Sequence, residues 1–243
     1  MVDDEDLLSQ KLEGPTIALD PSNPFSARVQ ASLKRTAECY GIVKDLALYA
    51  EELKDESFLP PINELRDAFD HLMRAYAVQF GLRSGDGKYI AENVDAAFRH
   101  VYRALFDYLD YIRIYQKDYI YKKLDGISHP TIVSLFPEYY SEILPEIESC
   151  LEDIPRYRGS KDIGNPDLEM AGQYHAKVMK LKDYCAQIQK KAPALIEAEN
   201  KRQLEEEERE KKKSDLRRGE HWKYLLFTII GSVIGGIIIA VFT

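Results

Sequence analysis

The feature that most constrains the fold of this chain is a run of twenty uncharged, mostly apolar residues at positions 224–243. A helix of about twenty apolar residues rises about 30 Å, which matches the hydrocarbon core of a bilayer. A soluble helix of that length would need a polar face, and this run has none. The run therefore predicts one C-terminal transmembrane helix over residues 222–243.

The residues that flank this run indicate its orientation. Arg217, Arg218 and Lys223 are basic, and Trp222 and Tyr224 are amphipathic aromatics of the kind found at membrane interfaces. The first ten residues are acidic, whereas a signal peptide begins with basic and then apolar residues. We therefore expect a tail-anchored, single-pass membrane protein with its N-terminal domain in the cytoplasm.

Small residues recur within the same run. Gly231 and Gly235 form a GxxxG pattern, and Ser232 and Gly236 repeat the spacing one residue further on. Such a face lets two transmembrane helices approach closely. These residues predict a homodimer.

Three long segments upstream carry apolar residues at alternating steps of four and three, which is typical of helices that pack nearly antiparallel. No segment shows the alternation of a strand between turns. The expected fold class is all-α: an antiparallel helical bundle of about four to five helices, followed by a charged helical stalk and one C-terminal transmembrane helix. The three stripes are Val29, Leu33, Thr36, Tyr40, Val43, Ala47 and Ala50; Val94, Phe98, Val101, Leu105, Tyr108, Ile112, Tyr115 and Tyr119; and Ala171, Tyr174, Val178, Leu181, Cys185 and Ile188.

The expected boundaries follow from composition and from proline and glycine. We expect a disordered N-terminus at residues 1–24 and the helical bundle at residues 25–192. The charged stalk is expected at residues 193–221 and the membrane anchor at residues 222–243. A shorter helix is expected between Pro60 and Gly81, a proline-punctuated helix over residues 137–151 and a loop over residues 154–166. Pro193 is expected to kink or hinge the stalk.

Composition and motif searches narrow the chemistry. The net charge of −8 argues against a general nucleic-acid coat, although a local basic patch can still bind RNA. Cys39, Cys150 and Cys185 are far apart and form no CxxC, which favours a reducing compartment over a zinc site. The chain has no Glu-x-x-His pair, HExxH, Walker loop or GxSxG. We expect no metal and no cofactor.

The helix that follows Pro61 carries the clearest candidate for chemistry. Steps of about 100° per residue place its large apolar side chains on one side, which we expect to face the core. His71 then points almost directly away from that side, and Arg66 lies at its edge. The apolar side consists of Leu65, Phe69, Leu72 and Tyr76.

The segment from Arg66 through Asp67 to His71 resembles the motif of the HEPN superfamily. Members carry Arg, a polar residue and, after four to six residues, His on a helix of an α-helical bundle. In catalytic members two protomers bring both motifs into one cleft and cut RNA without a metal ion. The resemblance implies that His71 acts as general acid or base for attack by a ribose 2′-hydroxyl, that Arg66 stabilises charge on the phosphate and that Asp67 orients one of them.

Three functions compete at this stage. The first is a HEPN-like, metal-independent endoribonuclease that acts on RNA in defence or stress. The second is a non-enzymatic membrane-anchored adaptor or sensor that oligomerises and binds a protein partner, with His71 in an exposed salt-bridge network. The third is a tethering protein that resembles SNAREs, which is weakened because residues 199–218 lack apolar heptads. The other bundle histidines, His100 among them, are expected to serve packing or surface roles.

Overall fold

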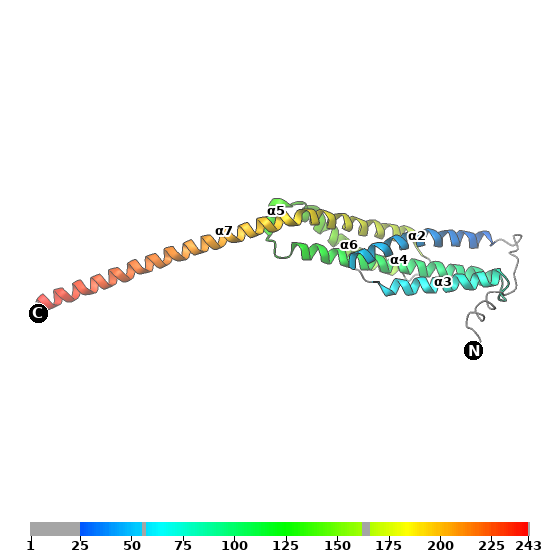
Figure 1. Cartoon of the computed structure of the whole chain (residues 1–243), viewed down its shortest axis with the longest axis horizontal. Helices are drawn as coiled ribbons and strands as arrows, with labels where there is room; N and C mark the ends of the chain where they lie inside the picture. Colours follow the sequence, from blue (N-terminus) through cyan, green and yellow to red (C-terminus); the bar gives the residue numbers. More distant parts are fainter. Residues whose placement is uncertain (1–24, 55–56, 162–165, 243) are drawn as a thin grey trace, which may run out of the picture. The chain divides into compact units, whose positions relative to one another are not determined.

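The computed structural model of the protein describes residues 25–54, 57–161 and 166–242, with side chains described as far as residue 229 (Figure 1). Over these residues the protein is all-α, with six α-helices, one short π-helical turn and no strand. The chain divides into two compact units. Unit 1 comprises the residues up to Lys122 and Leu144–Ala186, and unit 2 comprises Lys123–Ile143 and the residues from Gln187 onward. The N-terminus predicted to be disordered lies outside the described residues.

Unit 1 is a bundle centred on helix α4 (Gly87–Leu124). Around it lie α2 (Ala27–Lys54), α3 (Leu59–Gln79), α6 (Leu144–Lys161) and the first part of α7 (Leu168–Phe242) (Figure 1). Each of these helices makes a hydrogen bond to α4, and the aromatic side chains of α4 fill the core between them. The fully buried large side chains of α4 are Phe98, Tyr102, Leu105, Phe106, Leu109, Ile112 and Ile120.

Most positions of the predicted stripes are buried, as predicted. In α2 the buried residues recur at alternating steps of three and four, from Val29 to Ala50. One exception, Tyr40, is 48% exposed. The other exceptions are half-buried: Leu33, Ala47, Tyr115, Tyr119 and Cys185. Burial at this spacing explains why the helices pack lengthwise against one another.

The predicted limits of the shorter helix are confirmed. Pro60 and Pro61 lie in the first turn of α3. Backbone N–H groups in the first turn make no hydrogen bond within the helix, so a proline there removes none. Gly81 follows the helix with φ at 69°, a left-handed conformation that glycine adopts without strain. The next helix, α4, starts after Asp86, whose Oδ1 accepts the Tyr89 amide at 2.8 Å.

The loop predicted over residues 154–166 is wrong, because α6 continues through Pro155 to Lys161. Tertiary contacts explain the difference. The ring of Tyr157 stacks on Tyr174 with centroids 4.5 Å apart, and the Ser160 hydroxyl lies 2.7 Å from that of Tyr102. Burial of this segment outweighs the hydrogen bond that proline removes.

The predicted C-terminal transmembrane helix is also wrong. A single helix, α7, runs from Leu168 to Phe242 through Pro193, with no separate stalk and anchor. Within the described residues, no helix combines the length and the apolarity that crossing a membrane requires. Only residues 224–229 of the apolar run have described side chains, and charged residues precede them as far as Lys223. The small residues of the predicted dimer face, Gly231, Ser232, Gly235 and Gly236, have side chains outside the described residues.

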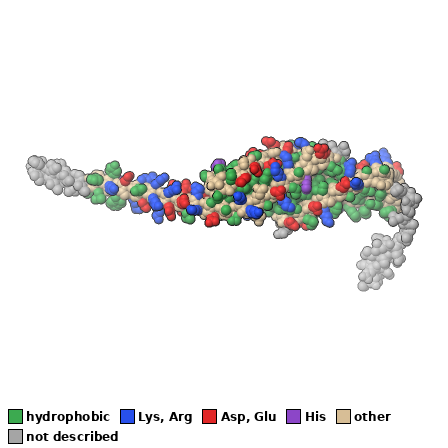
Figure 2. All heavy atoms as spheres, turned by 90° about the horizontal axis from the view of Figure 1, so that it is seen from above, with side chains coloured by type: hydrophobic (Ala, Val, Ile, Leu, Met, Phe, Trp, Pro, Cys, Tyr) green, Lys and Arg blue, Asp and Glu red, His purple; other side chains and the backbone are tan. Residues whose placement is uncertain are grey.

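Unit 2 contains a buried carboxylate that accepts several hydrogen bonds. It contains α5 (His129–Leu135), the π-helical turn η1 (Tyr139–Ile143) and the later part of α7. The Glu199 side chain on α7 is only 4% exposed and accepts hydrogen bonds from the Ser128 hydroxyl and the Thr131 hydroxyl, both at 2.6 Å. Further along α7, acidic and basic side chains are intermixed on the surface, as the sequence predicted for residues 199–218 (Figure 2).

Candidate functional site

The candidate site lies where α3 and α4 pack side by side in unit 1. Glu64, near the start of α3, contacts Arg103, whereas His71, further along α3, contacts Asn93. Residue numbers rise along one helix as they fall along the other, so the two helices run antiparallel. This packing brings the polar side chains of two helix faces together.

The imidazole of His71 is held in one tautomer by α4. Its Nδ1 lies 2.9 Å from Oδ1 of Asn93, and the Nδ2 of Asn93 donates to the Tyr89 carbonyl at 2.9 Å. Because the second bond fixes the amide orientation, Asn93 presents its oxygen to the ring. His71 therefore donates through Nδ1, which leaves Nε2 as the acceptor in the neutral ring.

The imidazole of His100 is held in the same way by α3. Its Nδ1 lies 2.7 Å from Oε2 of Glu64, and the same oxygen accepts from Arg103 at 3.3 Å. Arg103 Nη1 also lies 3.3 Å from this Nδ1, but the contact to the carboxylate is the shorter of the two and favours a proton on Nδ1, because an ionised carboxylate only accepts hydrogen bonds. The side chains of His100 and Glu64 are 18% and 26% exposed, which keeps the pair partly screened from water.

The two imidazoles form a stacked pair. Their ring centroids are 5.3 Å apart and their planes are inclined by 25°. In both rings Nδ1 is engaged with a neighbour that orients the ring, and neither Nε2 has a hydrogen-bond partner among the described residues. Two imidazoles at this separation can act as the base and the acid of a single reaction.

Of the residues that the sequence predicted, Arg66 and Asp67 bond to each other beside this pair. Arg66 Nη2 donates to Asp67 Oδ1 at 2.9 Å, and the Arg66 side chain is 70% exposed. The bond from Arg66 lowers the pKa of Asp67, and the nearby charges of His100 and His71 lower it further. The structure thus brings Asp67 close to both imidazoles and leaves the Arg66 guanidinium at the surface.

Two expectations about α3 need correction. The Phe69 side chain, expected in the core, is 61% exposed, and the side chains buried at the centre of α3 are Ala68 and Ala75. His71, expected to point away from the core, is half-buried and contacts Asn93 of α4. Because Ala68 and Ala75 are small, α3 packs on the bundle through these two residues. In this orientation His71 lies between α3 and α4, and Phe69 lies outside that interface.

Sequence reasoning missed the half of the site that α4 contributes. Asn93, His100 and Arg103 lie at spacings of seven and three residues, which places them on one helix face. That spacing was a usable signal, but nothing in the sequence shows that this face packs on His71. His100, for which a packing or surface role was expected, packs against His71 in the structure.

Comparison with known proteins assigns the chain to no family. No family model matches the chain, and no curated protein or solved structure matches it. Within the part of the chain that the structure describes, no cluster of three or more His, Cys, Asp or Glu side chains is arranged to hold a metal ion. Function is therefore inferred from the geometry of the site.

Proposed function

We propose that the protein is a metal-independent endoribonuclease of HEPN type that acts in defence or stress. The observation that carries this proposal is the stacked pair of His71 and His100, each with Nδ1 bonded to an orienting neighbour. RNA needs no external nucleophile, because its own 2′-hydroxyl can attack the adjacent phosphate. A base and an acid that both reach one phosphate are then sufficient.

The proposed step balances its protons between the two imidazoles. The neutral imidazole removes the 2′-hydroxyl proton as the oxygen attacks phosphorus, and the bond from phosphorus to the 5′-oxygen breaks. The protonated imidazole donates its proton to that leaving oxygen. The products are a 2′,3′-cyclic phosphate and a 5′-hydroxyl, and the two imidazoles have exchanged protonation states.

In this proposal two arginines near the histidine pair stabilise the charge that develops on the phosphate. Arg103 is bonded to Glu64 beside His100, and Arg66 is bonded to Asp67 on the surface of α3. A guanidinium can bind two phosphate oxygens at once. In this proposal Asp67 positions Arg66, Glu64 positions His100, and a homodimer places two such sites together, as the resemblance implies.

The test measures cleavage of a set of structured RNA substrates by the full chain in EDTA. We expect His71→Asn and His100→Asn each to reduce cleavage by about 10²–10⁴-fold, which is the usual contribution of a general acid or base. His221→Asn is the matched control, because His221 is exposed on α7 in unit 2. Circular dichroism must show equal helicity. Equal cleavage by all four proteins would contradict the proposal and indicate contamination.

A second candidate, an adaptor that oligomerises through protein contacts, is favoured by an exposed apolar groove between α2 and α3. The groove has a volume of about 520 Å³ and includes Leu33, Tyr40 and Phe69. Phe69 is 61% exposed and Tyr40 is 48% exposed. If the groove joins two copies, Phe69→Ala will convert a dimer to a monomer in sedimentation, and RNA cleavage will be absent from the wild type as well.

A further inference from the structure

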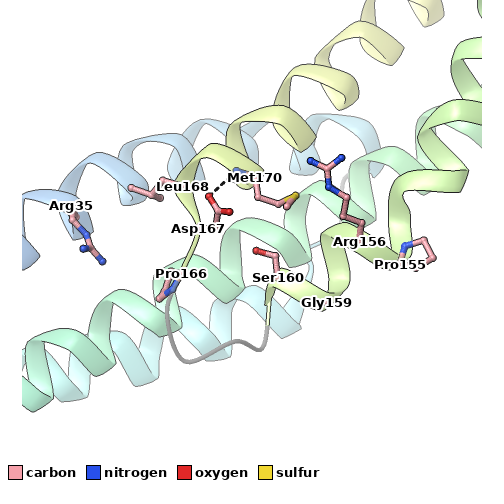
Figure 3. Close-up of a pocket in the computed structure, with 9 residues that line it drawn as sticks. All are labelled: Arg35, Pro155, Arg156, Gly159, Ser160, Pro166, Asp167, Leu168 and Met170. Carbon is pink, nitrogen blue, oxygen red and sulfur yellow. Dashed lines mark hydrogen bonds between the residues drawn. The ribbon is translucent and has the colours of Figure 1, made fainter.

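A cavity lined by arginines lies on α2 and α4, apart from the histidine pair. It has a volume of about 320 Å³, and Arg28, Arg35 and Arg99 line it; we call it the arginine cavity. A second cavity of about 750 Å³ shares Arg35 and Pro166 with it. Figure 3 shows this second cavity, with Arg35 on α2 and Arg156 on α6. The two cavities therefore adjoin at Arg35 and Pro166, and we call the pair of cavities the hollow.

Positive charge exceeds negative charge in the arginine cavity. Among the described residues that line the cavity, the one acidic side chain, Asp95, already bonds Arg28 at 2.9 Å and the Ser32 hydroxyl at 2.8 Å. In the adjoining cavity Asp167 accepts the Met170 amide at 3.1 Å, at the start of α7. These carboxylates are therefore occupied, which leaves other guanidiniums of the hollow to attract an anion.

Arg35 and Arg99 are the guanidiniums available for a ligand. Neither has a carboxylate partner among the described residues. The Arg35 guanidinium carbon lies 4.3 Å from the centroid of the buried Phe98 ring, a cation–π contact that restricts its position. Arg99 is half-buried, so its charge gains more from an anionic partner than a fully exposed charge would.

The helix α4 connects this cavity with the histidine pair. Arg99 and Arg103 are four residues apart and so are neighbours on one face of the helix. Arg103 bonds Glu64, and Glu64 bonds His100. Arg99 at the cavity and Arg103 beside His100 therefore lie about one helical turn apart along α4.

We propose that the arginine cavity binds a backbone phosphate of single-stranded RNA, adjacent to the phosphate that is cut at the histidine pair. The identity of the ligand rests on the proposed nuclease function. The chemistry is that of guanidinium and phosphate, which form paired, charge-assisted hydrogen bonds. The cavity would thus fix the register of the strand without reading its sequence.

The experiment measures binding separately from cleavage. The full chain is titrated into a fluorescent 2′-O-methyl RNA oligonucleotide, which lacks the 2′-hydroxyl nucleophile, and anisotropy is followed at several salt concentrations. We expect Arg35→Gln with Arg99→Gln to weaken binding by at least about tenfold. The dependence of log affinity on log salt should become shallower by about 0.7 for each phosphate that the variant no longer neutralises.

The matched control is Lys34→Gln with Lys88→Gln. It removes the same charge from the same two helices, and both lysines are 78% exposed with only a partner four residues along their own helix. Equal weakening in both double variants, or no binding by the wild type, would overturn the inference. Binding that depends on the arginines without cleavage of unmodified RNA would overturn the nuclease proposal alone. Cleavage with unchanged binding in the arginine variant would overturn the inference alone.

Discussion

At the scale of single residues, a buried polar network ties α4 to α7. The Tyr174 hydroxyl donates to Asp110 Oδ1 at 2.5 Å and accepts from Arg113 Nε at 3.1 Å. Burial raises the pKa of Tyr174, and the Asp110 charge raises it further, so the phenol remains neutral. Because Arg113 is itself buried, the hydroxyl satisfies groups that water reaches poorly.

Replacing that hydroxyl should cost stability. Tyr174→Phe leaves Asp110 and Arg113 each short of a partner, and we expect the free energy of unfolding to fall by about 1–3 kcal/mol. Urea denaturation followed by circular dichroism measures it. Tyr121→Phe is the control, because Tyr121 is 39% exposed on the same bundle. A Tyr174→Phe protein as stable as the control would show that water replaces the hydroxyl.

Thiol reactivity tests burial directly. Burial raises the pKa of Cys39 and of Cys185 to about 12, and it also raises the pKa of Cys150. All three thiols are free, so at pH near 8 only a small thiolate fraction exists in the folded protein. We expect iodoacetamide to label the native protein slowly and all three thiols quickly in urea. Equal rates in the two conditions would contradict the packing around these side chains.

At the scale of elements, local signals marked some helix limits and missed others. The limits of α3 were predicted from Pro60, Pro61 and Gly81. Proline and glycine restrict or widen the backbone angles at their own positions, so their effect can be predicted from the local sequence. The path of α6 through Pro155 depends on where Tyr157 finds its partner on α7. The two tyrosines are far apart in the sequence, so no local pattern indicates that they will be in contact.

The attachment of α5 to α7 should depend on pH through Glu199. Hydrogen bonds from Arg202, Ser128 and Thr131 lower the pKa of this carboxyl well below its ordinary value of 4.5. A lowered folded pKa stabilises the folded state above the ordinary value, and that stabilisation is lost as the pH falls below it. The protection factors of the amides of residues 129–135, which compare the measured exchange rates with the intrinsic rates at each pH, should therefore fall on acidification. Protection factors that fall as the pH rises would contradict this.

The same attachment can be tested at neutral pH by substitution. Glu199→Gln keeps the shape of the side chain but removes the charge that Arg202 and the two hydroxyls bond. We expect faster amide exchange in α5 and little change in unit 1. Glu197→Gln, at an exposed position of the same helix, is the control. Equal exchange in the two variants would show that other contacts hold α5.

At the scale of the whole molecule, periodicity predicted the bundle but not its polar interface. Apolar spacing placed Val43 and Val178 in the core, and both are fully buried. The histidine on α3 was identified from its motif, whereas its partner His100 depends on the rotation that Ala68 and Ala75 allow. At the C-terminus, apolar composition predicted a separate membrane helix. The structure has instead one continuous helix, α7, whose residues change from charged to apolar toward its C-terminal end.

The central claim is that the histidine pair cuts RNA through the 2′-hydroxyl without a metal ion. The most direct measurement is mass spectrometry of the RNA ends that the full chain produces in EDTA, with His71→Asn protein alongside. We predict 2′,3′-cyclic phosphate and 5′-hydroxyl ends from the wild type and almost none from the variant. Ends that carry a 3′-hydroxyl, or the same products from both proteins, would contradict the claim.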